Sequence, residues 1–158
     1  GTSFHIYLPA TRRQPCLEDE RPVSMPSGRV TGRVLVMDDE EIVREVCGNM
    51  LIKLGYEVAF AQHGQEAIDK YTHAQRYESP FDLVIMDLTI PGGMGGKEAI
   101  LKLQEIDQNI RAVVSSGYSN DTIMANYKDY GFKGIIAKPY NIKELDDLVS
   151  MILNEPTG

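Results

Sequence analysis

Short apolar runs alternate with stretches of helical periodicity from Arg33 to residue 154. The runs are rich in Val, Ile, Leu and Met, too short for buried helices, and typical of strands covered on both faces. Between them, apolar residues recur three or four positions apart, as in amphipathic helices. The predicted strands lie near 33–37, 57–61, 82–86, 111–115 and 133–137, and the predicted helices near 40–54, 64–77, 95–106, 121–129 and 141–154. Five strand–helix units predict a doubly wound α/β fold.

The first and last predicted helices show the clearest apolar spacing. We expect both apolar sets to face the sheet. Gly55 and Gly131 stand where left-handed helix ends are expected, and Asn141 where a side-chain cap is expected. The apolar sets are Ile42, Val46, Met50 and Leu54 in the first helix, and Ile142, Leu145, Leu148, Val149 and Ile152 in the last.

Residues 1–32 differ from the rest of the chain. FHIYL alternates like a strand, and the segment after it combines mixed charge with four prolines. Prolines so spaced disfavour regular structure, so we expect 9–32 to be a linker. Residues 33–154 then form one domain, and 155–158 are a tail. The prolines are Pro9, Pro15, Pro22 and Pro26.

The composition narrows the function classes. The chain has 158 residues, 42% of them hydrophobic, which suits one domain with its own core. A net charge of -7 and no cluster of Lys and Arg argue against direct binding of nucleic acid. Cys16 and Cys47 alone cannot build a disulfide framework or a paired-cysteine metal site. Without a membrane span or a signal core, we expect a cytoplasmic domain with no membrane contact.

Polar residues stand at the ends of four predicted strands. Asp38 and Asp39 follow RVLVM, and Asp87 follows FDLVIM. Ser116 ends the next run and Lys138 follows GIIA. In open α/β sheets, ligands bind beyond the carboxyl ends of the strands, so we expect these side chains to converge there. Three carboxylates, a hydroxyl and an ammonium suit a divalent cation and a phosphoryl group.

This set of groups predicts phosphoryl-transfer chemistry. Mg²⁺ prefers a few carboxylates together with waters and a substrate phosphate. A carboxylate beside such a cation can attack phosphorus and become an aspartyl phosphate. Lys138 would supply positive charge and Ser116 a hydrogen-bond donor for the developing negative charge. Pro139, directly after the lysine, is consistent with a rigid turn that aims its side chain.

Four sequence blocks, VLVMDDEE, DLVIMDLTIPGG, VVSSGYS and AKPY, resemble in order those of the receiver domains of two-component response regulators, the CheY-like family. The resemblance covers roughly residues 33–154. It implies a flavodoxin-like (βα)5 fold with a five-stranded parallel sheet of order 2-1-3-4-5. It also implies Mg²⁺-dependent transfer of a phosphoryl group from a phosphohistidine, followed by conformational switching.

The resemblance also implies roles for individual residues. Asp87 would be the phosphoacceptor, Ser116 the switch hydroxyl and Lys138 the partner of the phosphate. The separation of Ser116 from Lys138 is the family's usual one, which favours Ser116 over Ser115. The implied Mg²⁺ ligands are Asp38, Asp39, Asp87 and Thr89, the last through its carbonyl oxygen.

Three features depart from the family pattern. The loop TIPGGMGG after Asp87 is one residue longer than usual, which affects the start of the third helix. Ile135 stands where many receivers carry an aromatic residue, so the usual aromatic rotation toward the switch hydroxyl cannot occur. Thr89 and Tyr118 hold positions that tune the dephosphorylation rate in the family.

The amino-terminal GTSFHIYLPA resembles the closing strand of the ATP-binding domain of histidine kinases. Residues 1–8 would then be a remnant of that domain, ahead of a linker and a receiver, which is the order in hybrid sensor kinases. The nucleotide-binding boxes are absent from this sequence. The partners implied are a histidine kinase dimerisation domain or a histidine phosphotransfer protein.

Two other functions compete with the receiver interpretation. A haloacid-dehalogenase-like phosphohydrolase would use Asp38 as nucleophile, but only Glu40 stands where its second acid belongs. A phosphorylation-independent interaction module would keep the fold without the chemistry, although the complete set of site residues argues against it. The glycines after Asp87 match no nucleotide-binding motif, so we interpret them as an active-site turn.

Overall fold

The sheet and the helices that cover it are described from a computed structural model, for residues 32–77, 79–117 and 125–155. Within these ranges there are five strands, four α-helices and one 3-10 helix. None of these helices is long and apolar enough to span a membrane. The elements are β1 (Arg33–Met37), α1 (Glu41–Lys53), β2 (Glu57–Ala61), α2 (Gly64–Arg76), β3 (Leu83–Asp87), α3 (Gly96–Ile106), β4 (Ala112–Ser116), η1 (Tyr127–Tyr130), β5 (Gly134–Ala137) and α5 (Ile142–Asn154).

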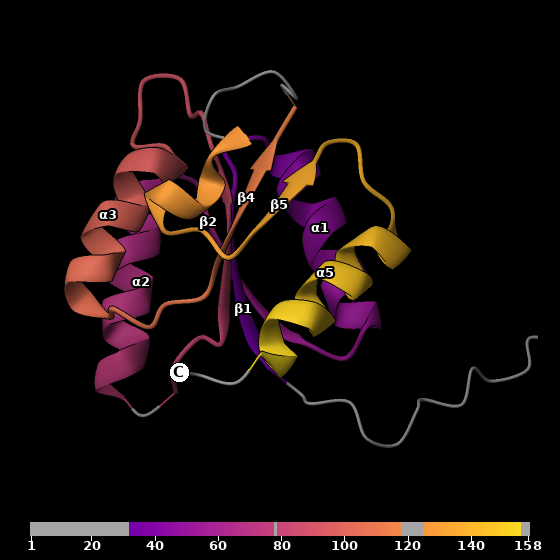
Figure 1. The fold of residues 1–158 in the computed structure, drawn as a ribbon, viewed down its shortest axis with the longest axis horizontal. Coiled ribbons are helices and arrows are strands. Elements are labelled where there is room, and N and C mark those ends of the chain that lie inside the picture. The colour runs from indigo at the N-terminus through magenta and orange to yellow at the C-terminus, as the bar shows by residue number, and fades with distance from the viewer. Residues whose placement is uncertain (1–31, 78, 118–124, 156–158) are drawn as a thin grey trace, which may run out of the picture.

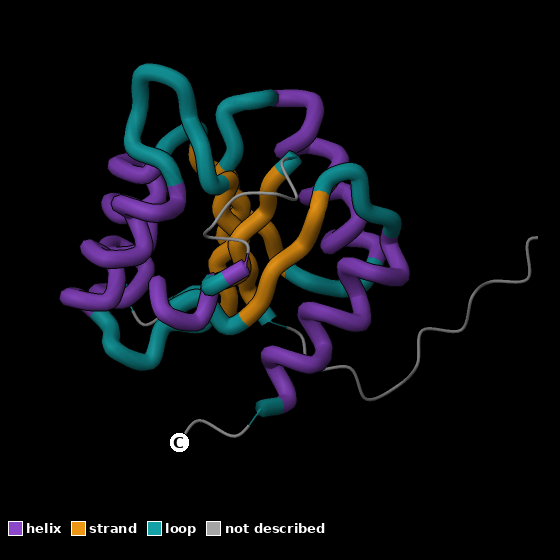
Figure 2. The backbone as a smooth tube through the Cα atoms, turned by 45° about the horizontal axis from the view of Figure 1, so that its top comes forward, coloured by secondary structure: helices purple, strands orange, loops and turns teal. Residues whose placement is uncertain are grey.

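The strands form one parallel sheet of order β2-β1-β3-β4-β5, which confirms the predicted topology. Helices α1 and α5 cover one face, and α2 and α3 cover the other (Figure 1). Figure 2 shows the strands enclosed between these two helical layers. In the register, Met37 of β1 lies beside Met86 of β3, and Asp87 beside Ser115 of β4. The carboxyl ends of β1 and β3 are therefore level with each other.

Alternating strand residues build two cores, one on each face. Leu35 and Val84 join the core under α2 and α3. Val36 and Ile85 join the core under α1 and α5. Because both faces are covered, the central strands are apolar at nearly every position, as the sequence predicted.

Helix α1 packs only partly with the face that was expected. Ile42 is 77% exposed and Val46 is 47% exposed, whereas Met50 and Leu54 pack against the core, so only the second half of the predicted apolar set faces the sheet. Cys47 and Leu51 are buried there instead. A row of residues at intervals of four winds around a helix with 3.6 residues per turn, so it cannot stay on one face. Gly48 lets α1 approach β2, because an added Cβ would lie 2.3 Å from Phe60 Cζ.

Helix α5 follows its prediction more closely. Leu145, Val149 and Ile152 are buried, and Leu148 packs against the same core, whereas Ile142 is 39% exposed at the first turn. Asn141 caps the helix through its side chain, in a capping box with Glu144.

The predicted glycine turns are also present. Gly55 and Gly131 have φ of 93° and 89°, in the left-handed region where an L side chain would be strained. Residues 121–124 of the predicted helix 121–129 lie outside the described residues, and the described part includes the 3-10 helix η1. The expectations for residues 1–31, for Tyr118 and for the end of the tail also lie outside them.

Candidate functional site

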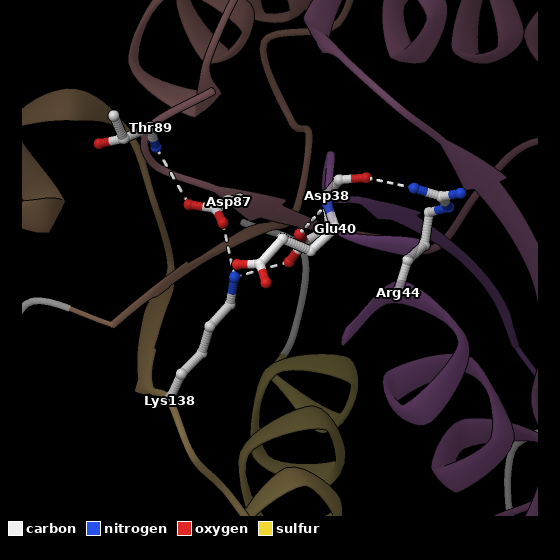
Figure 3. A network of polar contacts seen from close by, with 6 residues as sticks. All are labelled: Asp38, Glu40, Arg44, Asp87, Thr89 and Lys138. Atoms are coloured by element: carbon white, nitrogen blue, oxygen red, sulfur yellow. Dashed lines mark hydrogen bonds and ion pairs between the residues drawn. The ribbon is translucent and has the colours of Figure 1, made fainter. Parts of the chain in front are cut away.

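The carboxyl edge of the sheet brings together most of the predicted site residues. Asp38 directly follows β1, Asp87 is the last residue of β3, and Lys138 directly follows β5. Because β1 and β3 are neighbours in register, Asp38 and Asp87 lie level across the sheet. Figure 3 shows both carboxylates pointing toward the Lys138 ammonium. The convergence predicted from the sequence is therefore found.

Three carboxylates form the acidic part of the site. One oxygen each from Asp38, Asp39 and Asp87 lies within 4.8 Å of the others. Asp38 and Asp87 are 4% and 9% exposed, whereas Asp39 is exposed. Hard oxygen ligands at this spacing, with one side open to solvent, fit Mg²⁺, which keeps several waters. The backbone N–H of Thr89 donates to Asp87 Oδ1 at 3.0 Å, so Thr89 borders the cluster.

Lys138 bridges two of these carboxylates. Its Nζ lies 2.6 Å from Asp38 Oδ2 and 2.5 Å from Asp87 Oδ2. The Lys138–Pro139 peptide bond is cis. The ammonium thus places a positive charge between two of the three carboxylates. A cation or a phosphoryl group entering the site would compete for the same oxygens.

The ion pairs and burial shift two pKa values. Burial raises the pKa of Asp38 above its ordinary value, although the hydrogen bond from Lys138 acts in the opposite direction. Burial lowers the pKa of Lys138, but the hydrogen bonds and charges of Asp38 and Asp87 outweigh it, and the net pKa is raised. Lys138 therefore stays charged at neutral pH.

Ser116 is buried at the end of β4, and its backbone carbonyl accepts a 2.8 Å hydrogen bond from the Lys138 N–H. In the register, however, Ser115 and not Ser116 pairs with Asp87. Ser115 belongs to the face of α1 and α5, like Val113 two residues before it. Ser116, one residue further, lies on the opposite face. The two serines thus approach the site from different sides of the sheet.

The loop after β3 is held close to the strand. An added Cβ at Gly95 would lie 2.4 Å from the Leu88 carbonyl oxygen, and one at Gly96 would lie 2.8 Å from that of Asp87. Close backbone approach accounts for these two glycines. Helix α3 begins at Gly96, within one residue of the predicted start.

Sequence reasoning missed Arg44, a buried residue of α1. Its Nη1 donates to the backbone carbonyl of Asp38 at 2.6 Å (Figure 3). The Asp38 side chain is held separately, because the Glu40 N–H donates to its Oδ1 at 3.0 Å. The only available signal was the position of Arg44, three residues before Cys47, on what is now seen to be the buried face of α1.

A shallow apolar groove lies beside the site. Exposed Ile42 and Val46 line it from α1. Pro139 and Tyr140 line it from the β5–α5 loop, together with the stem of Lys138. Burial raises the pKa of the Tyr140 hydroxyl above its ordinary range. Ile135 of β5 is 36% exposed and lies outside this groove.

Comparisons with known proteins agree with this geometry. Residues 34–150 match the response regulator receiver domain family. Sporulation initiation phosphotransferase F of Bacillus subtilis is 33% identical over 121 residues, covering 77% of this chain and 93% of that protein. The sensor kinase CckA of Brucella abortus is 27% identical over 98% of this chain and 17% of that protein. The CheX–CheY–BeF3–Mg complex of Borrelia burgdorferi has the same fold, with a TM-score of 0.71 and 24% identity over 78% of this chain and 90% of that one.

Proposed function

This chain belongs to the response regulator receiver family, and we propose that Asp87 is the residue at which it accepts the phosphoryl group. The domain is a phosphoacceptor of two-component signalling. The observation that supports Asp87 is its place at the end of β3, the middle strand of the sheet, with Asp38 after β1 on one side and Lys138 after β5 on the other. Its Oδ2 lies 2.5 Å from Lys138 Nζ. Asp38, the nucleophile of the hydrolase alternative, lies at the side of the cluster nearest α1.

In the proposed reaction, a carboxylate oxygen of Asp87 attacks the phosphorus of a phosphohistidine. An oxygen–phosphorus bond forms as the phosphorus–nitrogen bond breaks, and the imidazole leaves with the bonding electron pair. Lys138 moves its hydrogen bond from the carboxylate to a phosphoryl oxygen. Mg²⁺, when bound, would neutralise charge on the phosphoryl oxygens. The residues proposed to hold it are Asp38, Asp39, Asp87 and the carbonyl of Thr89.

Ser116 is the proposed switch residue. Its backbone carbonyl accepts a hydrogen bond from the Lys138 N–H. A movement of Lys138 toward a phosphoryl group would therefore shift the end of β4. A phosphoryl group adds about -1.5 to -2 charges in one step. This local change can bias β4, β5 and their loops between two arrangements. Ile135, exposed on β5, would report the change at the surface, and Thr89 and Tyr118 are proposed to tune the lifetime of the phosphorylated state.

We further propose that the phosphodonor docks on the apolar groove. Ile42 and Val46 are exposed apolar residues on a helix whose opposite face is buried, which marks an interaction surface. The groove includes the stem of Lys138, so an occupant would lie next to Asp87. A helix presenting a phosphohistidine beside apolar residues fits this surface. Such a helix belongs to a kinase dimerisation domain or a phosphotransfer protein.

The hybrid-kinase origin is also a proposal. The similarity to the sensor kinase of Brucella abortus extends over 98% of this chain, so it includes residues before β1. The amino-terminal GTSFHIYLPA resembles the end of a kinase ATP-binding domain. Both observations favour a parent protein in which a kinase core precedes this receiver. The domain order of the whole gene product tests this directly.

Brief exposure to a small phosphodonor with Mg²⁺, followed by peptide mass spectrometry, tests the phosphoacceptor. We expect the added phosphoryl mass on the peptide containing Asp87, and its loss in Asp87→Asn, which has nearly the same shape. A label on Asp38 instead would favour the hydrolase. If Mg²⁺ with beryllofluoride leaves the amide spectra around Asp87 unchanged, the interaction module is the better description.

A further inference from the structure

Arg44 is the one lysine or arginine that is buried within the described ranges, at 9% exposure. Its side chain forms a single hydrogen bond there, from Nη1 to the Asp38 carbonyl oxygen at 2.6 Å, and no ion pair with a described carboxylate. Burying a guanidinium costs several kcal/mol unless an opposite charge or hydrogen-bond acceptors compensate for the lost hydration. An aliphatic residue would fill the same helical position without that cost. The position of the charge therefore needs a reason other than packing.

The hydrogen bond fixes one peptide unit of the acidic loop. The carbonyl of Asp38 points to Arg44, on the side away from Asp87 and Lys138 (Figure 3). With the carbonyl held on that side, the plane of the peptide between Asp38 and Asp39 is set. The direction in which Asp39 leaves the backbone is then set as well. Asp39 is the exposed member of the cluster and has no other anchor of this kind in the described structure.

The side chain and the backbone of Asp38 are thus each held by a hydrogen bond. The Glu40 N–H holds its carboxylate, and Arg44 holds its carbonyl. We propose that Arg44 is a positioning residue for the divalent cation: it keeps the carboxylates of Asp38 and Asp39 converged on one point. This inference rests on the proposed function, because it assumes that the acidic cluster binds Mg²⁺.

The guanidinium also contributes charge close to the cluster. Lys138 contacts two of the three carboxylates, and Arg44 adds a second positive charge at the carbonyl of Asp38. Removing a group that orients a metal ligand through a hydrogen bond lowers the metal affinity about 10- to 100-fold. Arg44 acts on the metal only through Asp38 and Asp39, so it is not a ligand or a catalytic residue.

Calorimetric titration of the full chain with Mg²⁺ at neutral pH tests the proposal. Arg44→Met keeps an apolar stem but loses charge and donors, and we expect its Kd for Mg²⁺ to rise about 10- to 100-fold. Arg44→Lys should recover most of the affinity. Lys53→Met, on an exposed position of the same helix, is the matched control and should leave the Kd unchanged. Urea unfolding of each variant is recorded in parallel.

A purely structural role predicts a different result. A helix anchor would lower the urea midpoint but leave the Kd of the folded protein alone, so a folded Arg44→Met with a Kd within about twofold of wild type overturns the proposal. If Arg44→Met does not fold, Arg44→Gln replaces it, since its amide is too short to reach the Asp38 carbonyl. Equal affinities of Arg44→Gln and Arg44→Lys would then overturn it. Failure of the wild-type chain to bind Mg²⁺ would instead contradict the proposed function.

Discussion

Replacing Lys138 with methionine removes the cation that bridges two buried carboxylates. The side chains of Lys138, Asp38 and Asp87 are 15%, 5% and 12% exposed. Removing one partner of a fully buried ion pair costs about 3–5 kcal/mol. Here the carboxylates retain some solvent, and the raised pKa of Asp38 lets it take up a proton more readily. We therefore expect the free energy of unfolding without Mg²⁺ to fall by about 2–3 kcal/mol.

Magnesium should reverse most of this loss. A ligand that binds only the folded protein at 100 times its Kd raises the free energy of unfolding by about 2.7 kcal/mol. In the wild type the ion must compete with the Lys138 ammonium for the same oxygens, whereas in Lys138→Met it does not. The variant should bind Mg²⁺ more tightly, and at saturating Mg²⁺ the two proteins should differ by less than about 1 kcal/mol.

Urea unfolding followed by far-ultraviolet circular dichroism measures both effects, since the chain has no tryptophan. Each protein is unfolded with a chelator and with saturating Mg²⁺, and the m-values are compared to confirm a common unfolded state. Lys102→Met, at an exposed position of α3, is the control and should change stability by less than about 0.5 kcal/mol. An equal loss with and without Mg²⁺ would refute the reasoning, because the cost would then not be electrostatic.

Three further predictions concern pH, thiol reactivity and packing. Because burial raises the pKa of Asp38, protons should compete with Mg²⁺ and weaken its binding as the pH falls, starting above the ordinary value of 3.8; a calorimetric Kd that is constant from neutral to mildly acidic pH would contradict this. Burial raises the pKa of Cys47 from 9.0 to about 11, so in a Cys16→Ser background its thiolate should be about 100-fold scarcer and its reaction with a thiol reagent correspondingly slow until urea unfolds the chain. Tyr71→Phe removes the 2.7 Å hydrogen bond from a buried hydroxyl to Asp107 and should lower the free energy of unfolding by about 1.5–3 kcal/mol; an unchanged urea midpoint would show that this link between α2 and α3 carries no stability.

The sequence was most informative where one physical rule acts alone. Strands covered on both faces are apolar throughout, so the five strands were predicted within one residue of their observed bounds. The carboxyl ends of parallel strands meet at one edge, so the sequence alone predicts that Asp38, Asp87 and Lys138 lie together. Local hydrogen bonding likewise fixed the Asn141 cap.

The first half of the apolar set in α1 was predicted wrongly for a physical reason. This helix carries apolar residues on two sides. One side includes Cys47 and Leu51, and the other includes Ile42 and Val46. Periodicity shows that both rows exist but does not tell which one meets the sheet. The row left in solvent lies beside the site, where an interaction surface would be needed. Arg44 lies on the same buried face as Cys47 and Leu51, which the predicted apolar set did not include.

Charge counting shows why Lys138 and Arg44 cannot replace each other. With Asp38, Asp39 and Asp87 ionised, the two basic side chains leave the site at a net charge of about -1. A bound Mg²⁺ would bring it to about +1, and conversion of the Asp87 carboxylate to an aspartyl phosphate of nearly two negative charges would return it close to zero. Lys138 is bonded to carboxylate oxygens, so it can follow the charge onto the phosphoryl group. Arg44 is bonded to a main-chain carbonyl whose charge does not change, so it stays in place throughout and keeps the acidic loop fixed while the rest of the site rearranges.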